Sequence, residues 1–89
     1  MEVNGKLTIN CERCGKSYDF QKEDVKFKPE GEKDGDQCYV WELNFNCLRC
    51  SNPISIRYEI CLSADGKVSD KKLDIKGAKV AEDSFEFKA

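Results

Sequence analysis

The sequence predicts a small, mainly β domain on the basis of three observations. Apolar and polar side chains alternate with a period of two along several stretches, as they do in half-buried strands. No stretch of adequate length shows a convincing helical period. Two Cys-x-x-Cys motifs, Cys11–Cys14 and Cys47–Cys50, each end one alternating stretch and begin the next. We therefore expect a small antiparallel β-sheet with cysteines in its turns.

The first two predicted strands lie on either side of the first motif. Residues 6–10 alternate, with Leu7 and Ile9 on one side, and lead directly into Cys11. The motif and the glycine behind it predict a tight turn. Residues 17–20 then alternate again and form the second strand of this pair.

A long acidic insert follows. Residues 21–36 are hydrophilic and contain Pro29 and two glycines, so we expect a surface loop. Val25 and Phe27 leave open a short edge strand at its start. The insert holds four Lys against six acidic residues, which accounts for the whole formal net charge of -2. Nothing places two of its carboxylates in a pocket, so we expect them to be solvated.

Residues 37–46 and 54–62 are the clearest strands, and we expect them to pair as a hairpin around the second motif. Their apolar faces match only if, in each cross-strand pair, the residue numbers of the two partners add up to an odd number. A sum of 99 also sets Glu42 opposite Arg57, which is a favourable cross-strand charge pair. This register predicts the pairs Tyr39–Ile60, Trp41–Tyr58, Leu43–Ile56, Phe45–Ile54 and Cys38–Cys61.

The last part of the chain predicts a β extension. It begins at a turn signal, Asp65-Gly66, and then alternates weakly around Leu73 and again around Phe85. Ser69–Ile75 is the best helical candidate in the chain, although its helical period is poor.

The length bounds the organisation of the chain. At 89 residues we expect one domain, 1–89, with a core of about 6–62, the insert at 21–36 and a C-terminal extension at 63–89. A domain of this size buries little apolar surface, and such domains commonly need a metal or a disulfide to fold. The six cysteines are therefore central to the fold.

The spacing of four cysteines predicts a metal site. A Cys-x-x-Cys turn presents two sulfurs on the same side, so two such turns supply four ligands to a tetrahedral ion. The predicted ligands are Cys11, Cys14, Cys47 and Cys50, and the predicted ion is one structural Zn²⁺; iron accepts the same ligands. Four thiolates leave no open coordination position, so we expect the ion to stabilise the fold and to catalyse nothing.

This arrangement resembles the zinc ribbon, in which two Cys-x-x-Cys knuckles at hairpin tips hold one zinc ion between β-hairpins. The resemblance covers roughly residues 6–62 and rests on the motifs Cys11-Glu12-Arg13-Cys14-Gly15 and Cys47-Leu48-Arg49-Cys50. It implies the ligand role for the four cysteines and nothing more, because no particular ribbon subfamily matches. The chain departs from a minimal ribbon in its insert, its extension and two additional cysteines.

Two questions about the cysteines stay open in the sequence. A zinc-linked thiol redox switch is the rival interpretation of the motifs, but a redox Cys-x-x-Cys opens a helix, whereas both motifs here precede strand-like patterns. Cys38 and Cys61 are best interpreted as reduced, buried side chains. A cross-strand disulfide is the alternative, and a second set of metal ligands lacks further partners.

Composition narrows the function classes. The chain has no His, which excludes Cys/His zinc fingers, Ser-His-Asp triads and Cys-His dyads within it. We expect a protein that is not an enzyme, and no feature points to a small-molecule substrate. The N-terminal residues show no secretory signal, and no stretch is apolar enough for a membrane span. We therefore expect a cytoplasmic protein without membrane attachment.

Two binding functions remain as hypotheses. The first is a protein-interaction or adaptor module, favoured by the acidic balance and by Phe85 and Phe87, which we expect to be exposed at a sheet edge. The alternative is nucleic-acid binding through a basic face made of Arg13, Lys16, Arg49 and Arg57. Base stacking would then need exposed aromatic residues, for which Tyr39, Trp41 and Tyr58 are the candidates. Their regular alternation with polar residues favours a place in the core.

Overall fold

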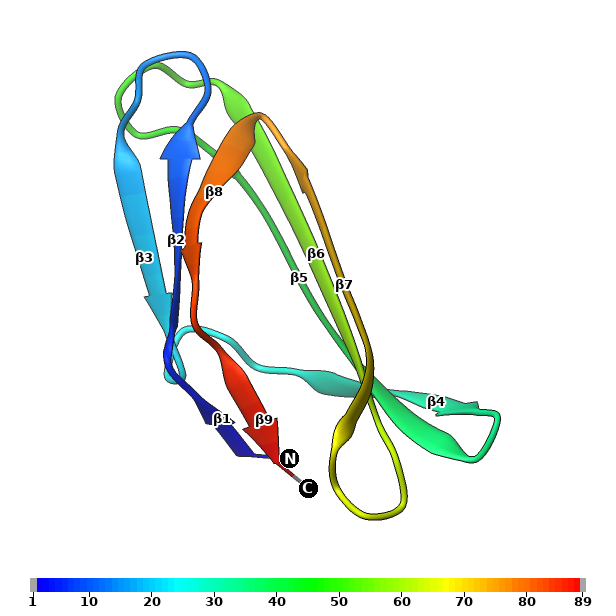
Figure 1. The fold of residues 1–89 in the computed structure, drawn as a ribbon. Coiled ribbons are helices and arrows are strands. Elements are labelled where there is room, and N and C mark those ends of the chain that lie inside the picture. The colour runs from blue at the N-terminus through cyan, green and yellow to red at the C-terminus, as the bar shows by residue number, and fades with distance from the viewer. Residues whose placement is uncertain (1, 89) are drawn as a thin grey trace.

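A computed structural model describes residues 2–88, and within that range the chain forms nine β-strands and no helix (Figure 1). The predicted mainly β class is therefore confirmed. The strands are β1 (Glu2–Asn4), β2 (Lys6–Cys11), β3 (Ser17–Gln21), β4 (Lys28–Lys33), β5 (Asp36–Asn46), β6 (Pro53–Leu62), β7 (Val68–Lys76), β8 (Ala78–Asp83) and β9 (Glu86–Lys88).

The strands form three antiparallel sheets. β1 pairs with β9, β3-β2-β8 form a three-stranded sheet, and β4-β5-β6-β7 form a four-stranded sheet. The two larger sheets share one apolar core and converge at the end that carries the two cysteine turns (Figure 1). The chain crosses from the four-stranded to the three-stranded sheet at Gly77, between β7 and β8. The C-terminal extension thus completes both sheets.

β5 and β6 pair in the register that the sequence predicted. Trp41 lies opposite Tyr58, Cys38 lies opposite Cys61, and every pair of numbers in this ladder adds to 99. The charge pair that selected this register is present, because Glu42 and Arg57 form an ion pair. Matching apolar faces and one cross-strand charge pair were therefore sufficient to place these two strands.

The core lies between the two larger sheets. Leu7 and Ile9 of β2 are fully buried, and so are alternate residues of β6. An aromatic cluster continues this core, with ring centroids 5.3–6.0 Å apart among Phe27, Tyr58, Phe85 and Phe87.

The expectation that Phe85 and Phe87 are exposed at a sheet edge is wrong. Their side chains are only 6% and 7% exposed. The physical reason is the pairing of β9 with β1, which sets Phe87 opposite Val3 and turns both phenylalanines towards Tyr58. This apolar surface is therefore already covered within the chain.

The insert is only partly a loop. Residues 22–27 form a turn and an irregular segment, so a short edge strand at its start is absent. The second half forms β4, which pairs with the start of β5, and here the loop prediction is wrong. The reason is the two-residue turn Asp34-Gly35, whose φ angles of 53° and 86° match the type I′ hairpin turn. Pro29 is tolerated because β4 is an edge strand.

The helical candidate is also wrong. Ser69–Ile75 lies within β7, which pairs with β6 along its length. Leu73 and Ile75 pack against the core, whereas the charged residues between and before them are exposed. The period-two pattern therefore outweighed a weak helical preference once β6 offered a hydrogen-bonding partner.

Candidate metal centre

Two turns of the same construction carry the four cysteines of the motifs. The first knuckle (Cys11–Gly15) joins β2 to β3, and the second knuckle (Cys47–Ser51) joins β5 to β6. In the first, the N–H of Gly15 donates to the carbonyl of Cys11 at 2.9 Å, and the N–H of Cys11 donates to the carbonyl of Lys16 at 2.9 Å. These bonds close the turn and present both sulfurs on one side.

The second knuckle, between β5 and β6, has the same two backbone hydrogen bonds. The N–H of Ser51 donates to the carbonyl of Cys47 at 2.8 Å, and the N–H of Cys47 donates to the carbonyl of Asn52 at 2.8 Å. Ser51 has a φ of 63°, and Gly15 at the equivalent position has a φ of 79°. Both knuckles therefore use a left-handed residue four positions after their first cysteine.

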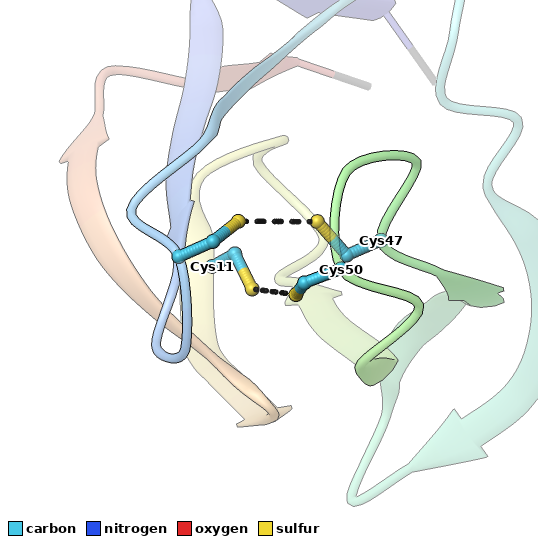
Figure 2. Close-up of side chains that lie close together, drawn as sticks. Cys11, Cys47 and Cys50 are labelled. Carbon is cyan, nitrogen blue, oxygen red and sulfur yellow. Dashed lines mark hydrogen bonds between the residues drawn. The ribbon is translucent and has the colours of Figure 1, made fainter.

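All four sulfurs meet between the two hairpins. Cys11 and Cys50 lie 3.6 Å apart, Cys14 and Cys47 lie 3.5 Å apart, and all four atoms fall within 4.8 Å of one another (Figure 2). These separations exceed a disulfide bond of about 2.05 Å. Zinc–sulfur bonds of about 2.3 Å in a tetrahedron set the sulfurs about 3.8 Å apart. The donor set and its spacing thus fit one tetrahedral metal ion.

The sequence predicted this grouping, and the structure brings all four cysteines together. Cys11 and Cys47, the first cysteine of each knuckle, are buried, whereas Cys14 and Cys50 are half-buried. Both knuckles lead into strands, β3 and β6, so neither motif has the helix N-terminus that activates redox Cys-x-x-Cys thiols. The geometry therefore favours metal binding over thiol exchange.

The thiols differ in acidity. A hydrogen bond from the Tyr18 hydroxyl lowers the pKa of Cys47 to about 6, and one from the backbone N–H of Cys14 lowers the pKa of Cys11. At Cys50 the N–H of Asn52 lowers the pKa, but burial and hydrogen bonds with the other three thiols raise it to about 12. Ionisation of all four thiols is therefore unfavourable without a metal, because the four thiolates would repel one another. A divalent cation would relieve that repulsion.

Tyr18 is a residue of the site that sequence reasoning missed. Its hydroxyl donates to the sulfur of Cys47 at 3.1 Å and accepts the backbone N–H of Leu48 at 2.9 Å. Tyr18 lies on β3, so it reaches from the first hairpin to the second knuckle. Its inward-facing position just after the first knuckle was visible in the sequence, but nothing local indicated the contact across the two hairpins.

Of the four residues of the candidate basic face, Arg57 is engaged by carboxylates. Arg13 and Arg49 are exposed on the two knuckles, and the ammonium of Lys16 lies over the ring of Tyr18 at 5.7 Å from its centroid. Arg57 instead forms ion pairs with three carboxylates on the outer face of the four-stranded sheet, those of Glu30, Glu42 and Glu59. Two of the candidate stacking residues, Trp41 and Tyr58, are buried.

Cys38 and Cys61 form a disulfide between β5 and β6, so the expectation of two reduced side chains is wrong. Their Cα atoms are 4.0 Å apart because the register sets the two residues directly opposite each other. The cross-strand alternative considered from the sequence is the one that the structure shows. The spacing of Cys38 and Cys61 in the sequence did not distinguish a reduced pair from a disulfide, because both states require the two side chains to be equally buried.

Comparison of the chain with protein-family models, with curated proteins and with solved structures finds no match in any of the three. The assignment of the metal centre therefore depends on its geometry. Within residues 2–88, no helix is long and apolar enough to cross a membrane.

Proposed function

We propose that this chain is a structural zinc domain of the ribbon type that serves as a protein-interaction module and has no catalytic role. The grouping of four cysteine sulfurs within 4.8 Å is the observation that carries this proposal. Four thiolate ligands fill a tetrahedral coordination sphere and leave no position for water or substrate. The bound ion then contributes to folding rather than to chemistry.

Zinc is the ion that this donor set fits best. Zn²⁺ imposes no geometric preference of its own and readily accepts four thiolates, whereas the hard cations Mg²⁺ and Ca²⁺ require oxygen ligands. Iron also accepts four thiolates, so elemental analysis of the purified protein is the measurement that identifies the metal.

The exposed tips of the knuckles support an interaction role. The side chain of Leu48 is 85% exposed at the tip of the second knuckle, beside Arg49, and Arg13 is exposed on the first. An exposed leucine beside an arginine is suited to a partner that offers an apolar pocket with acidic residues around it. The metal would hold this tip in one conformation and so lower the entropic cost of binding.

Nucleic-acid binding is the alternative, and the exposure of Arg13 and Arg49 is the observation that favours it. Fewer side chains are available to contact nucleic acid than the sequence indicated, because Arg57 is paired with carboxylates and Trp41 is buried. Binding to single- and double-stranded oligonucleotides across salt concentrations distinguishes the two functions. Steep weakening with salt supports phosphate contacts, and no binding at low salt removes this alternative.

Metal content with thiol counting tests the structural zinc site. We expect one zinc ion per purified chain and four thiols that react with a thiol reagent only after a chelator is added. Bound metal well below one ion per chain, or four thiols that react at once, would overturn the proposal.

The interaction role has its own test. Leu48→Glu should abolish co-purification of a partner that the wild type retains, while Val80→Glu, at an exposed valine on β8, should leave it unchanged. Equal retention by both variants would contradict a role for the knuckle tip.

A further inference from the structure

The corner between β7 and β8 contacts the first knuckle and Asn52, the residue that follows the second knuckle. The backbone carbonyl of Gly77 accepts the N–H of Glu12 at 3.1 Å and the side-chain amide Nδ2 of Asn52 at 3.0 Å. Glu12 follows the first cysteine of the first knuckle, and the carbonyl of Asn52 accepts the N–H of Cys47. A single carbonyl from the C-terminal extension thus links the first knuckle to Asn52, the residue whose own carbonyl closes the second knuckle.

This corner accepts only glycine. Gly77 has a φ of +83°, and a Cβ built on it would lie 2.1 Å from the carbonyl oxygen of Pro53. That oxygen belongs to the backbone where β6 begins, so it cannot move away as a flexible side chain would. The close approach of the corner to β6 is therefore a fixed feature of the fold.

The corner is also seated beside a predicted ligand. Ala78, the first residue of β8, is buried and lies opposite Cys11 in the pairing of β2 with β8. Figure 1 shows the β7–β8 corner at the same end of the molecule as the two knuckle turns. The extension therefore reaches the metal centre and does not merely lengthen the sheets.

We propose that Gly77 is a positioning residue of the metal centre, and that docking of the β7–β8 corner and metal binding are coupled. This inference rests on the proposed function, because it requires the four cysteines to bind a metal. The ion would link the two knuckles directly, and the Gly77 carbonyl links them through Glu12 and Asn52, so each holds the knuckles in the arrangement that the other needs. Linkage makes the coupling reciprocal: a displaced corner weakens metal binding, and metal loss loosens the corner.

Three variants of the full chain test this coupling. Gly77→Ala displaces the corner. Asn52→Ala removes the side-chain donor to the Gly77 carbonyl and leaves the backbone of the corner unchanged. Gly35→Ala is the matched control, because Gly35 has a similar φ of +86° but an added Cβ meets no atom within 4 Å. Zn²⁺ affinity is measured by competition with a chromogenic chelator, and the visible absorption spectrum of the Co²⁺-substituted protein reports the coordination geometry.

We expect Gly77→Ala to lower Zn²⁺ affinity by about 10–100-fold, as loss of outer-shell support typically does, and to alter the Co²⁺ spectrum. Asn52→Ala should lower the affinity by about fivefold, the effect of one lost hydrogen bond. Gly35→Ala should bind both ions as the wild type does. In the wild type, chelation of the metal should accelerate hydrogen exchange at the amide of Glu12, whose N–H donates to the corner.

The outcomes separate this inference from the proposed function. A wild type that binds no metal overturns the proposed function. A metal-binding wild type together with unchanged affinity and spectra in Gly77→Ala and Asn52→Ala overturns the inference alone, and so does an equal loss in Gly35→Ala. If Gly77→Ala does not fold, Asn52→Ala and the exchange rate of the Glu12 amide decide the question.

Discussion

At the scale of single residues, Tyr18 connects the aromatic core to the thiols. Its ring packs edge-on against Phe45 with centroids 5.1 Å apart, while its hydroxyl contacts Cys47 and the N–H of Leu48. The packing fixes the ring, so the hydroxyl is held at the sulfur before any metal arrives. Groups of this kind orient metal ligands and tune their charge.

Tyr18→Phe removes that hydroxyl and keeps the packing of the ring. We expect Zn²⁺ affinity to fall by about 10–100-fold because Cys47 loses a donor and the N–H of Leu48 loses its acceptor. Competition with a chelator measures the change. Tyr39→Phe, at a half-buried tyrosine on β5, is the control and should have no effect; equal losses in both variants would contradict the role of Tyr18.

The same hydroxyl also determines how many protons metal binding releases. The hydrogen bond from Tyr18 lowers the pKa of Cys47 to about 6, so this thiol contributes little to the protons released at pH 7.5 when a metal binds. Calorimetry in buffers of different ionisation enthalpy should therefore count fewer than four released protons in the wild type. The count should rise in Tyr18→Phe, where the pKa of Cys47 returns towards its ordinary value. The same count in both proteins would contradict this assignment.

At the scale of elements, the β5–β6 hairpin is fastened at both ends. The second knuckle lies at its tip, and the Cys38–Cys61 disulfide joins its two strands near the opposite end. Between them, Arg57 bonds to Glu42 across the hairpin and to Glu30 on the neighbouring β4. These ion pairs are half-exposed, so the disulfide contributes more to stability than they do.

Removal of the disulfide tests this arrangement. The double variant Cys38→Ser/Cys61→Ser should lower the free energy of unfolding by about 3.4 kcal/mol, the value for a closed loop with a sequence separation of 23. Denaturant unfolding of the metal-loaded protein measures the change. Metal stoichiometry should stay at one ion per chain, because neither residue lies in the metal centre. A lower stoichiometry would show that the two ends are not independent.

The sequence predicted this hairpin well because the signals that specify it lie within the hairpin's own segment of the chain. The β5–β6 register followed from alternation and one charge pair, and the four clustered cysteines followed from two spacings. β4 was missed because its strand-like signal is weak, although Asp34-Gly35 is a standard hairpin turn. The contacts of Tyr18 and Gly77 were missed because they join segments far apart in the chain.

At the scale of the whole molecule, the C-terminal extension holds the two larger sheets together. It adds β7 to one sheet and β8 to the other, and then buries Phe85 and Phe87 in the aromatic cluster. The buried hydroxyl of Tyr58 on β6 donates to Asp83 on β8 at 2.8 Å, and Lys71 on β7 pairs with the same carboxylate at 3.1 Å. The extension is therefore part of the fold rather than an appendage to a ribbon.

Phe87→Ala measures the contribution of the last strand. Truncation of a buried phenylalanine should lower the free energy of unfolding by about 3 kcal/mol, because it leaves a cavity among Phe27, Tyr58 and Phe85. Thermal or denaturant unfolding gives the value. Val80→Ala on the neighbouring β8, where the side chain is 45% exposed, should change it by less than about 0.5 kcal/mol. Similar effects of the two substitutions would place β9 outside the core.

In the proposed metal centre, four cysteines from two knuckles surround one zinc ion. X-ray absorption at the zinc edge of the purified protein tests it most directly, because this measurement counts the ligand atoms and gives their distances. We expect four sulfur atoms at about 2.3 Å and no lighter neighbour in the first shell. A first shell that contains oxygen or nitrogen, or fewer than four sulfurs, would contradict the closed tetracysteine site.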